Sequence, residues 1–161
     1  MIGWQNKNDV VVGNIGERIV RDILNSKGYV LYAPLNHELA HAFDMLAEKD
    51  KKDLFIVEVK TKRSREEYPD TGVDTRNYWV YKELSEKHNL PIFVYFVDYH
   101  LGEIYGNYLD ILEENITIYF ENRELDYPRF EGGIIYFPLQ SMVHIDYLTN
   151  KEIDEILKLK R

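Results

Sequence analysis

Residues 42–62 carry the strongest fold signal in the chain and read AFDMLAEKDKKDLFIVEVKTK. The second half of this segment is apolar at successive positions, which is typical of a strand in a sheet covered on both faces. The first half, AFDMLAE, fits either a helical or a strand period. If it is a strand, the charged run between the halves forms a turn centred near Lys51. An antiparallel hairpin then pairs residues whose numbers sum to 102, so Asp44 lies opposite Glu58.

Two carboxylates and one ammonium group would converge on one face of this hairpin. Directly opposed residues such as Asp44 and Glu58 point to the same face, with Cβ atoms about 5 Å apart. Lys60 shares that face because it lies two residues beyond Glu58. Carboxylates held this close repel each other unless a cation lies between them, and oxygen ligands suit Mg²⁺ or Mn²⁺. The alternative is a structural salt bridge between Lys60 and the acids, because an E-x-K spacing alone is a weak signal.

A wider set of residues around the hairpin resembles a known family. Glu17 precedes it, and the segment YPDTGVD and an expected helix follow it. In this order the residues are similar to the PD-(D/E)xK nuclease superfamily, which has a restriction-endonuclease-like fold. The similarity covers residues 13–98, and Phe43 stands where the family motif nominally has proline.

The resemblance implies roles for individual residues. Asp44 and Glu58 would be metal ligands and catalytic residues, with the backbone carbonyl of Val59 as a third ligand. Lys60 would be the catalytic lysine, and Glu17 would orient water or help to bind a second metal. The substrate would be DNA, cleaved at its phosphodiester bonds with Mg²⁺ or Mn²⁺ as cofactor.

Two of the roles that the resemblance implies have an alternative interpretation. Asn14 and Glu17 have the spacing of a helix capping box, so Glu17 could serve only the start of a helix. Asn77 and Tyr81 lie four residues apart on an expected helix, where many superfamily members carry a glutamine and a tyrosine. Because asparagine replaces glutamine here, packing of this helix on the sheet is the favoured interpretation of Tyr81.

The rest of the chain predicts an α/β (α+β) fold with a central mixed sheet flanked by helices. Helices are expected at 14–27, with Asn14 as N-cap and Gly28 as the stop, and at 75–89 after Asp74. Strands are expected at 29–33 and 91–99, then in EIYGNYL, ITIYF and GIIYF within a β-rich extension, before a closing helix capped by Thr149 and Glu152. We expect a single domain over 1–161, with a nuclease-like core at about 13–98 and the extension at 99–161.

Composition limits the class of protein. The chain has 161 residues, 45% of them hydrophobic, no cysteine and a net charge of −8. Cysteine chemistry is excluded, and no apolar run approaches the roughly 20 residues that cross a bilayer. We expect a cytoplasmic (intracellular) protein without membrane contact. Nine acidic and two basic residues at 98–132 hold most of the negative charge, and we expect this segment to face away from DNA.

Basic residues gather after the proposed catalytic strand. Lys62, Arg63 and Arg65 enter a polar loop, and Arg76 and Lys82 follow on the expected helix. We predict that these five bases bind DNA phosphates. The alternative is a solvated loop, since acids follow the strip at once.

A second motif points elsewhere. The segment HELAH at 37–41 matches the zinc-binding pattern H-E-x-x-H, with Glu38 as general base. Pro34 upstream and the lack of a third ligand make a zinc metalloprotease the weaker hypothesis. The favoured prediction is a Mg²⁺-dependent deoxyribonuclease, and the alternative is a catalytically silent nuclease fold that binds nucleic acid or protein. The sequence does not distinguish endonuclease from exonuclease or DNA from RNA, and it leaves a homodimer open.

Overall fold

The hairpin predicted at residues 42–62 is present. β2 (Met45–Lys49) pairs antiparallel with β3 (Asp53–Thr61). The partners Met45 and Val57 have numbers that sum to 102, as do all other pairs of this ladder. The predicted register is therefore confirmed, and the ambiguous first half of the segment is a strand from Met45 onward.

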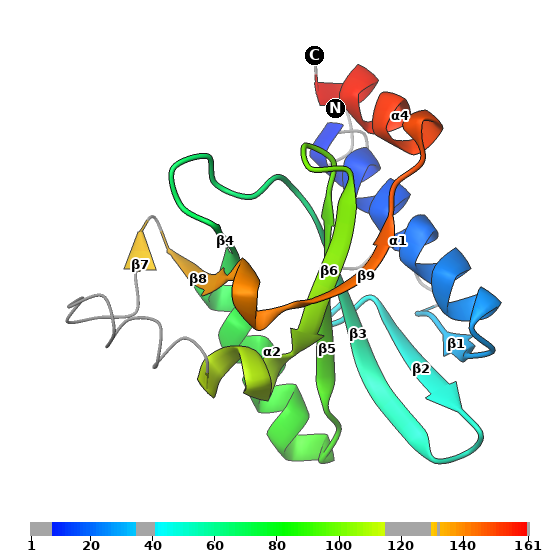
Figure 1. Cartoon of the computed structure of the whole chain (residues 1–161). Helices are drawn as coiled ribbons and strands as arrows, with labels where there is room; N and C mark the ends of the chain where they lie inside the picture. Colours follow the sequence, from blue (N-terminus) through cyan, green and yellow to red (C-terminus); the bar gives the residue numbers. More distant parts are fainter. Residues whose placement is uncertain (1–7, 35–40, 115–129, 132, 161) are drawn as a thin grey trace, which may run out of the picture.

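The computed structural model describes residues 8–34, 41–114, 130–131 and 133–160 (Figure 1). In chain order the elements are α1 (Asn8–Ser26), β1 (Val30–Tyr32), β2, β3, β4 (Asp70–Asp74), α2 (Thr75–His88), β5 (Ile92–Asp98), β6 (Glu103–Tyr108), β7 (Phe130–Glu131), β8 (Ile134–Pro138), the 3-10 turn η2 (Leu139–Ser141), β9 (Val143–Tyr147) and α4 (Asn150–Lys160). A further helical segment covers residues 109–114.

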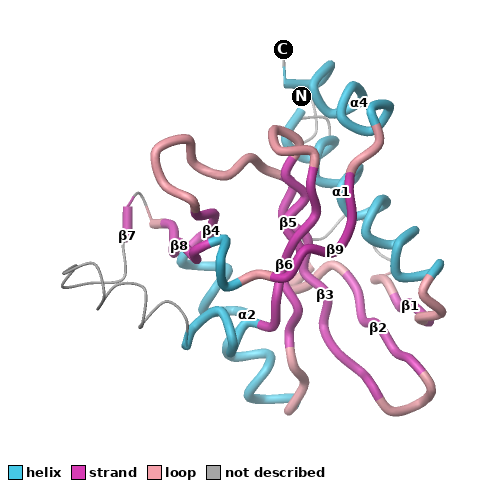
Figure 2. Tube along the Cα trace, viewed as in Figure 1, coloured by secondary structure: helices cyan, strands magenta, loops and turns pink. Residues whose placement is uncertain are grey.

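The central sheet has six strands in the order β1-β2-β3-β5-β6-β9. β3 and β5 are parallel, with Ile56 beside Ile92, and the other neighbours are antiparallel. The connection from β3 to β5 runs through β4 and α2, because parallel neighbours need a long crossover. Figure 2 shows the strands in the centre with helices on both sides. The predicted α/β fold with a mixed sheet flanked by helices is confirmed.

A second, three-stranded sheet was not predicted. Its order is β4-β8-β7, and it lies on the same side of the molecule as α2 (Figure 1). Gly72 of β4 permits this pairing, because a Cβ at this position would lie 2.1 Å from the backbone oxygen of Ile135. The segment YPDTGVD therefore supplies an edge of a small sheet that faces the central one.

Two apolar clusters hold the central sheet between its covering layers. On one face, Val57 of β3 packs with Ile19 of α1 and Ile156 of α4. On the other face, Ile56 of β3 packs with Tyr81 of α2. Because successive strand residues point to opposite faces, the side chains two and four positions beyond Ile56 also face α2 and the small sheet.

The start of the first helix differs from the prediction. α1 begins at Asn8, so Asn14 lies inside the helix and is not its N-cap. The reason is burial: Val12 is 1% exposed and continues the apolar stripe of Ile15 and Ile19. Tertiary packing of such a stripe supplies most of the stability of a helix in a protein. The predicted stop is confirmed, since Gly28 has a φ of +84°.

The later elements largely follow the sequence. The capping box of α4 is confirmed, with the Thr149 N–H donating to Glu152 and the Glu152 N–H donating to Thr149. Asp74 is the N-cap of α2, but its side chain makes no capping hydrogen bond. The segment ITIYF and residues 37–40 of HELAH lie outside the described residues. Among the helices described, none is long and apolar enough to span a bilayer.

Candidate active site

The two predicted carboxylates meet where β2 stops pairing with β3. The ladder ends at Met45 and Val57, and Asp44 is the next residue outward. Its Oδ2 accepts a hydrogen bond of 2.7 Å from the N–H of Val59. The aspartate side chain thus takes the place of a strand partner, which holds it on the edge of β3 beside Glu58.

Glu58 is buried, with 4% of its surface exposed, and two donors hold one of its oxygens. Lys60 Nζ donates to Glu58 Oε1 at 2.7 Å, and the hydroxyl of Tyr81 donates to the same atom. Lys60 Nζ also lies 5.7 Å from the centre of the Tyr81 ring. The lysine, the glutamate and the tyrosine therefore form one connected group between β3 and α2.

This surrounding changes the acidity of Asp44. Burial, and after it the charges of Glu58 and Glu17, raise the pKa of Asp44 to about 8. The Val59 N–H and the Lys60 ammonium act in the opposite direction. The structure thus concentrates carboxylates beyond what one lysine offsets, which is the environment that a bound cation would relieve.

Glu17 reaches this cluster from α1. It is partly buried and lies close enough for its charge to act on Asp44. Because α1 begins at Asn8, Glu17 is in the helix interior and cannot form a capping box with Asn14. The interpretation of Glu17 as a helix-start residue is wrong, and its place beside the carboxylate pair is a feature of the tertiary structure.

The donor set fits a hard divalent cation. Asp44 Oδ1 and Glu58 Oε2 receive no hydrogen bond from the residues that the structure describes. The carbonyl of Val59 lies on the same edge of β3 as its N–H, because both groups of a strand residue point to one side. Oxygen ligands of this kind suit Mg²⁺ or Mn²⁺, which keep several waters. No three His, Asp or Glu side chains of the described residues are grouped to hold an ion, so a cation here would depend on the predicted pair of carboxylates and the Val59 carbonyl.

The predicted DNA-binding bases are only partly free. Arg65 donates to both oxygens of Asp70, at 2.7 and 2.6 Å, and its guanidinium carbon lies 3.7 Å from the centre of the Tyr136 ring. Lys82 pairs with Glu113 at 2.9 Å. These two bases hold the loop and the helix to their neighbours, so binding of phosphate by either would have to break an existing ion pair.

The other three bases differ in exposure. Lys62 Nζ donates to the Gly72 oxygen at 2.7 Å, and burial lowers the pKa of Lys62 although Asp74 opposes this. Arg63 and Arg76 are exposed. Among the residues that the structure describes, Arg63 pairs with the exposed Glu66, at 3.0 Å. The strip after β3 therefore presents fewer accessible cations than its sequence indicates.

Two residues matter more than the sequence suggested. Tyr81 is buried as the packing interpretation required, yet its hydroxyl also contacts Glu58. Asp98, which the sequence grouped with an acidic surface segment, is fully buried at the end of β5. It accepts hydrogen bonds from the N–H groups of Ser64 and Leu101 and from the Tyr105 hydroxyl. No local signal could have separated these partners from ordinary polar residues.

Known structures share this arrangement of strands and helices. Neither a protein-family model nor a curated protein matches the chain. The chain is similar to Hjc, a Holliday junction resolvase from the archaeal hyperthermophile Archaeoglobus fulgidus, with a TM-score of 0.54, 10% identity, and coverage of 83% of this chain and 91% of that one. The bacterial homing endonuclease I-Ssp6803I matches with a TM-score of 0.46, 17% identity, and coverage of 80% and 73%. The likeness to the resolvase shows the fold, so the restriction-endonuclease-like fold expected from the PD-(D/E)xK resemblance is confirmed.

Proposed function

We propose that this protein is a metal-dependent nuclease that hydrolyses phosphodiester bonds in DNA. The observation that supports this best is the convergence of Asp44, Glu58 and Lys60 at the end of the β2–β3 ladder. Buried carboxylates are costly unless they are paired or bind a metal. Lys60 pairs with Glu58, and its charge also acts on Asp44. The fold shared with a Holliday junction resolvase supports the same reaction class by analogy.

The cation would be held by Asp44, Glu58 and the carbonyl of Val59. When bound, Mg²⁺ or Mn²⁺ would neutralise charge on the phosphate and acidify a coordinated water. Without it, the charges of Glu58 and Glu17 would repel a scissile phosphate, so DNA binding as well as cleavage should need the metal.

The protein residues have distinct tasks in this proposal. The Lys60 ammonium donates a hydrogen bond to a phosphate oxygen as negative charge develops there, while retaining its protons. Tyr81 fixes one oxygen of Glu58, which leaves Oε2 directed to the ligand side. Glu17 accepts a hydrogen bond from the attacking water and so orients it. The exposed Arg63 and Arg76 position the strand through its phosphates.

A cleavage assay tests the proposal directly. Supercoiled plasmid, linear duplex and branched DNA are incubated with the protein in Mg²⁺ or in EDTA. We expect cleavage only with the metal, and its loss in Lys60→Ala. Lys52→Ala is the matched control, because Lys52 is an exposed lysine in the turn of the same hairpin.

Other outcomes would point to other functions. Binding of DNA without cleavage of any of these forms would favour the alternative of a nuclease fold that binds but does not cut. Cleavage that persists undiminished in EDTA would contradict the proposed metal site.

A further inference from the structure

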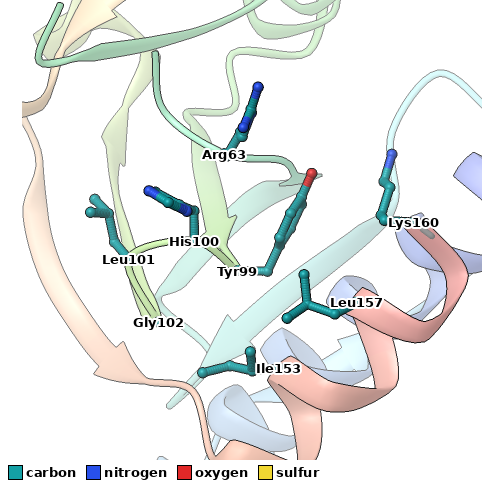
Figure 3. A pocket seen from close by; sticks show the side chains of 8 residues that line it. All are labelled: Arg63, Tyr99, His100, Leu101, Gly102, Ile153, Leu157 and Lys160. Atoms are coloured by element: carbon teal, nitrogen blue, oxygen red, sulfur yellow. The ribbon is translucent and has the colours of Figure 1, made fainter. Parts of the chain in front are cut away.

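A hollow of about 600 Å³ lies at the end of the sheet where β5 turns into β6. Figure 3 shows Arg63, Tyr99 and Lys160 around it, with Leu157 and Ile153 of α4 on its apolar side. These residues come from the loop after β3, the β5–β6 turn and the C-terminal helix. The hollow contains none of the residues of the carboxylate cluster.

One buried carboxylate holds two walls of this hollow in place. Asp98 accepts a hydrogen bond of 2.8 Å from the N–H of Ser64, next to Arg63. It also accepts bonds of 2.9 and 3.0 Å from the N–H groups of His100 and Leu101 in the β5–β6 turn. The backbone that carries Arg63 is therefore fixed relative to the backbone that carries Tyr99 and His100. A site whose supports are fixed in this way is preorganised for a ligand.

The lining combines positive charge with an aromatic and an aliphatic surface. Arg63 and Lys160 bring cations, and His100 adds a ring nitrogen. Within the described part of the chain, both cations pair with exposed acids: Arg63 with Glu66, and Lys160 with Asp9 at 2.6 Å. Exposed pairs of this kind are weak, so an anionic ligand can displace them. Cations beside an aromatic ring suit a nucleotide, whose phosphate and base need the two kinds of surface.

We propose that this hollow is a subsite for one nucleotide of a nucleic-acid strand, with its phosphate between Arg63 and Lys160. The proposal rests on the proposed function in one respect: the strand is the nuclease substrate. Arg63 lies three residues beyond Lys60, which is roughly 10 Å of extended chain. Because Lys60 faces α2 and the hollow is walled by α4, a strand bound at both places would pass around the end of β3 from one face of the sheet to the other.

The salt dependence of binding tests this subsite. A fluorescently labelled single strand and its duplex are titrated by anisotropy over a NaCl series, in Ca²⁺ to allow binding without cleavage. The double variant Arg63→Gln/Lys160→Gln is compared with Arg21→Gln/Lys158→Gln. The second pair changes the net charge equally, and Lys158 is an exposed lysine on the same helix that does not line the hollow.

Loss of two phosphate contacts should flatten the plot of log affinity against log salt. The expected change in slope is about 1.4 for the single strand and about 1.8 for the duplex, because each contact contributes about 0.7 or 0.9. The control pair should leave the slope unchanged. Equal changes of slope in both double variants would overturn the subsite. An unchanged slope in Arg63→Gln/Lys160→Gln would also overturn it, and this is the result expected if the hollow binds an acidic peptide. Thermal melts of both variants check that each is folded.

The result is separable from the cleavage test. If the wild-type protein cuts DNA but the Arg63/Lys160 variant binds with an unchanged slope, the subsite fails and the nuclease proposal stands. If no DNA is cut yet the slope flattens only in that variant, the subsite stands and the nuclease proposal fails.

Discussion

Replacing Asp98 with alanine should destabilise the protein more than any surface substitution. The Asp98 side chain is fully buried. Its carboxylate accepts four hydrogen bonds of 2.8 to 3.0 Å that join the loop after β3, the β5–β6 turn and β6. Alanine keeps none of these bonds.

The magnitude follows from which donors stay buried. Ser64 and Tyr105 are 7% and 6% exposed, so the Ser64 N–H and the Tyr105 hydroxyl would lose their partner away from water. Each buried donor left unpaired costs about 1–3 kcal/mol, which gives about 4 kcal/mol for the two. At about 2–4 °C per kcal/mol for a chain of this size, we expect Tm to fall by roughly 10 °C.

Thermal and urea unfolding, followed by circular dichroism, measure this change. Asp146→Ala is the matched control, because Asp146 is exposed and, among the described residues, accepts a hydrogen bond from the next N–H, that of Tyr147. Its effect should stay within about 0.5 kcal/mol. If the free energies of unfolding of Asp98→Ala and the control differ by less than about 1 kcal/mol, Asp98 does not hold these segments together. The argument for a preorganised hollow then also fails.

The dependence of stability on pH is a second test of the hydrogen bonds to Asp98. Burial alone would raise the pKa of Asp98, but the hydrogen bonds from Leu101, Ser64 and Tyr105 hold it below its ordinary value. The unfolded chain therefore binds this proton at a higher pH, near 3.9. The stability from Asp98 is present above that pH and is lost as pH falls through the lower folded pKa. Asp98→Asn should weaken this acid dependence, and an unchanged profile below pH 4 would contradict it.

Four further results are expected. Lys60→Ala should reduce the cleavage rate by about 100-fold or more with nearly unchanged DNA affinity; an equal loss of both would make Lys60 a phosphate anchor. Tyr81→Phe should cost about 1–2 kcal/mol in urea unfolding, because a bond to the buried Glu58 is lost, whereas Tyr147→Phe, at an exposed residue, should change nothing. Asp44→Asn should raise Tm in EDTA, since it removes a carboxyl group whose ionisation is opposed by burial and by the charge of Glu58, and should abolish the increase in Tm that Mg²⁺ gives the wild type; a gain that survives would place the metal elsewhere. For the wild type on duplex DNA, the slope of log affinity against log salt should be no steeper than roughly −4, because Lys62, Arg63, Arg76 and Lys160 contribute about −0.9 each, whereas Arg65 and Lys82 are held in ion pairs.

Local patterns in the sequence were sufficient for the β2–β3 hairpin and its register, for β1, β5, β6 and β8, and for most helix ends, but not for β4, β7 and β9. The β2–β3 pairing follows from the charged turn and from the apolar runs on either side, because a hairpin joins residues that are close in the chain. Gly28 and the Thr149–Glu152 capping box mark helix ends through backbone geometry and neighbouring side chains alone. Asp44 lies one position beyond the last pair of this ladder and accepts from the Val59 N–H, next to Glu58. The hairpin register therefore predicted that these two carboxylates lie close together.

Contacts between distant segments depended on the tertiary structure. Tyr81 meets Glu58 across 23 residues, and Asp98 meets Ser64 across 34; neither spacing has a periodic signature. The early start of α1, which moved Glu17 into the helix interior, depends on burial of Val12 against the sheet. A side chain that is buried by distant elements takes whatever donors those elements bring. The sequence therefore determined which residues share a strand face, and only the packing of the elements decided which of them became partners.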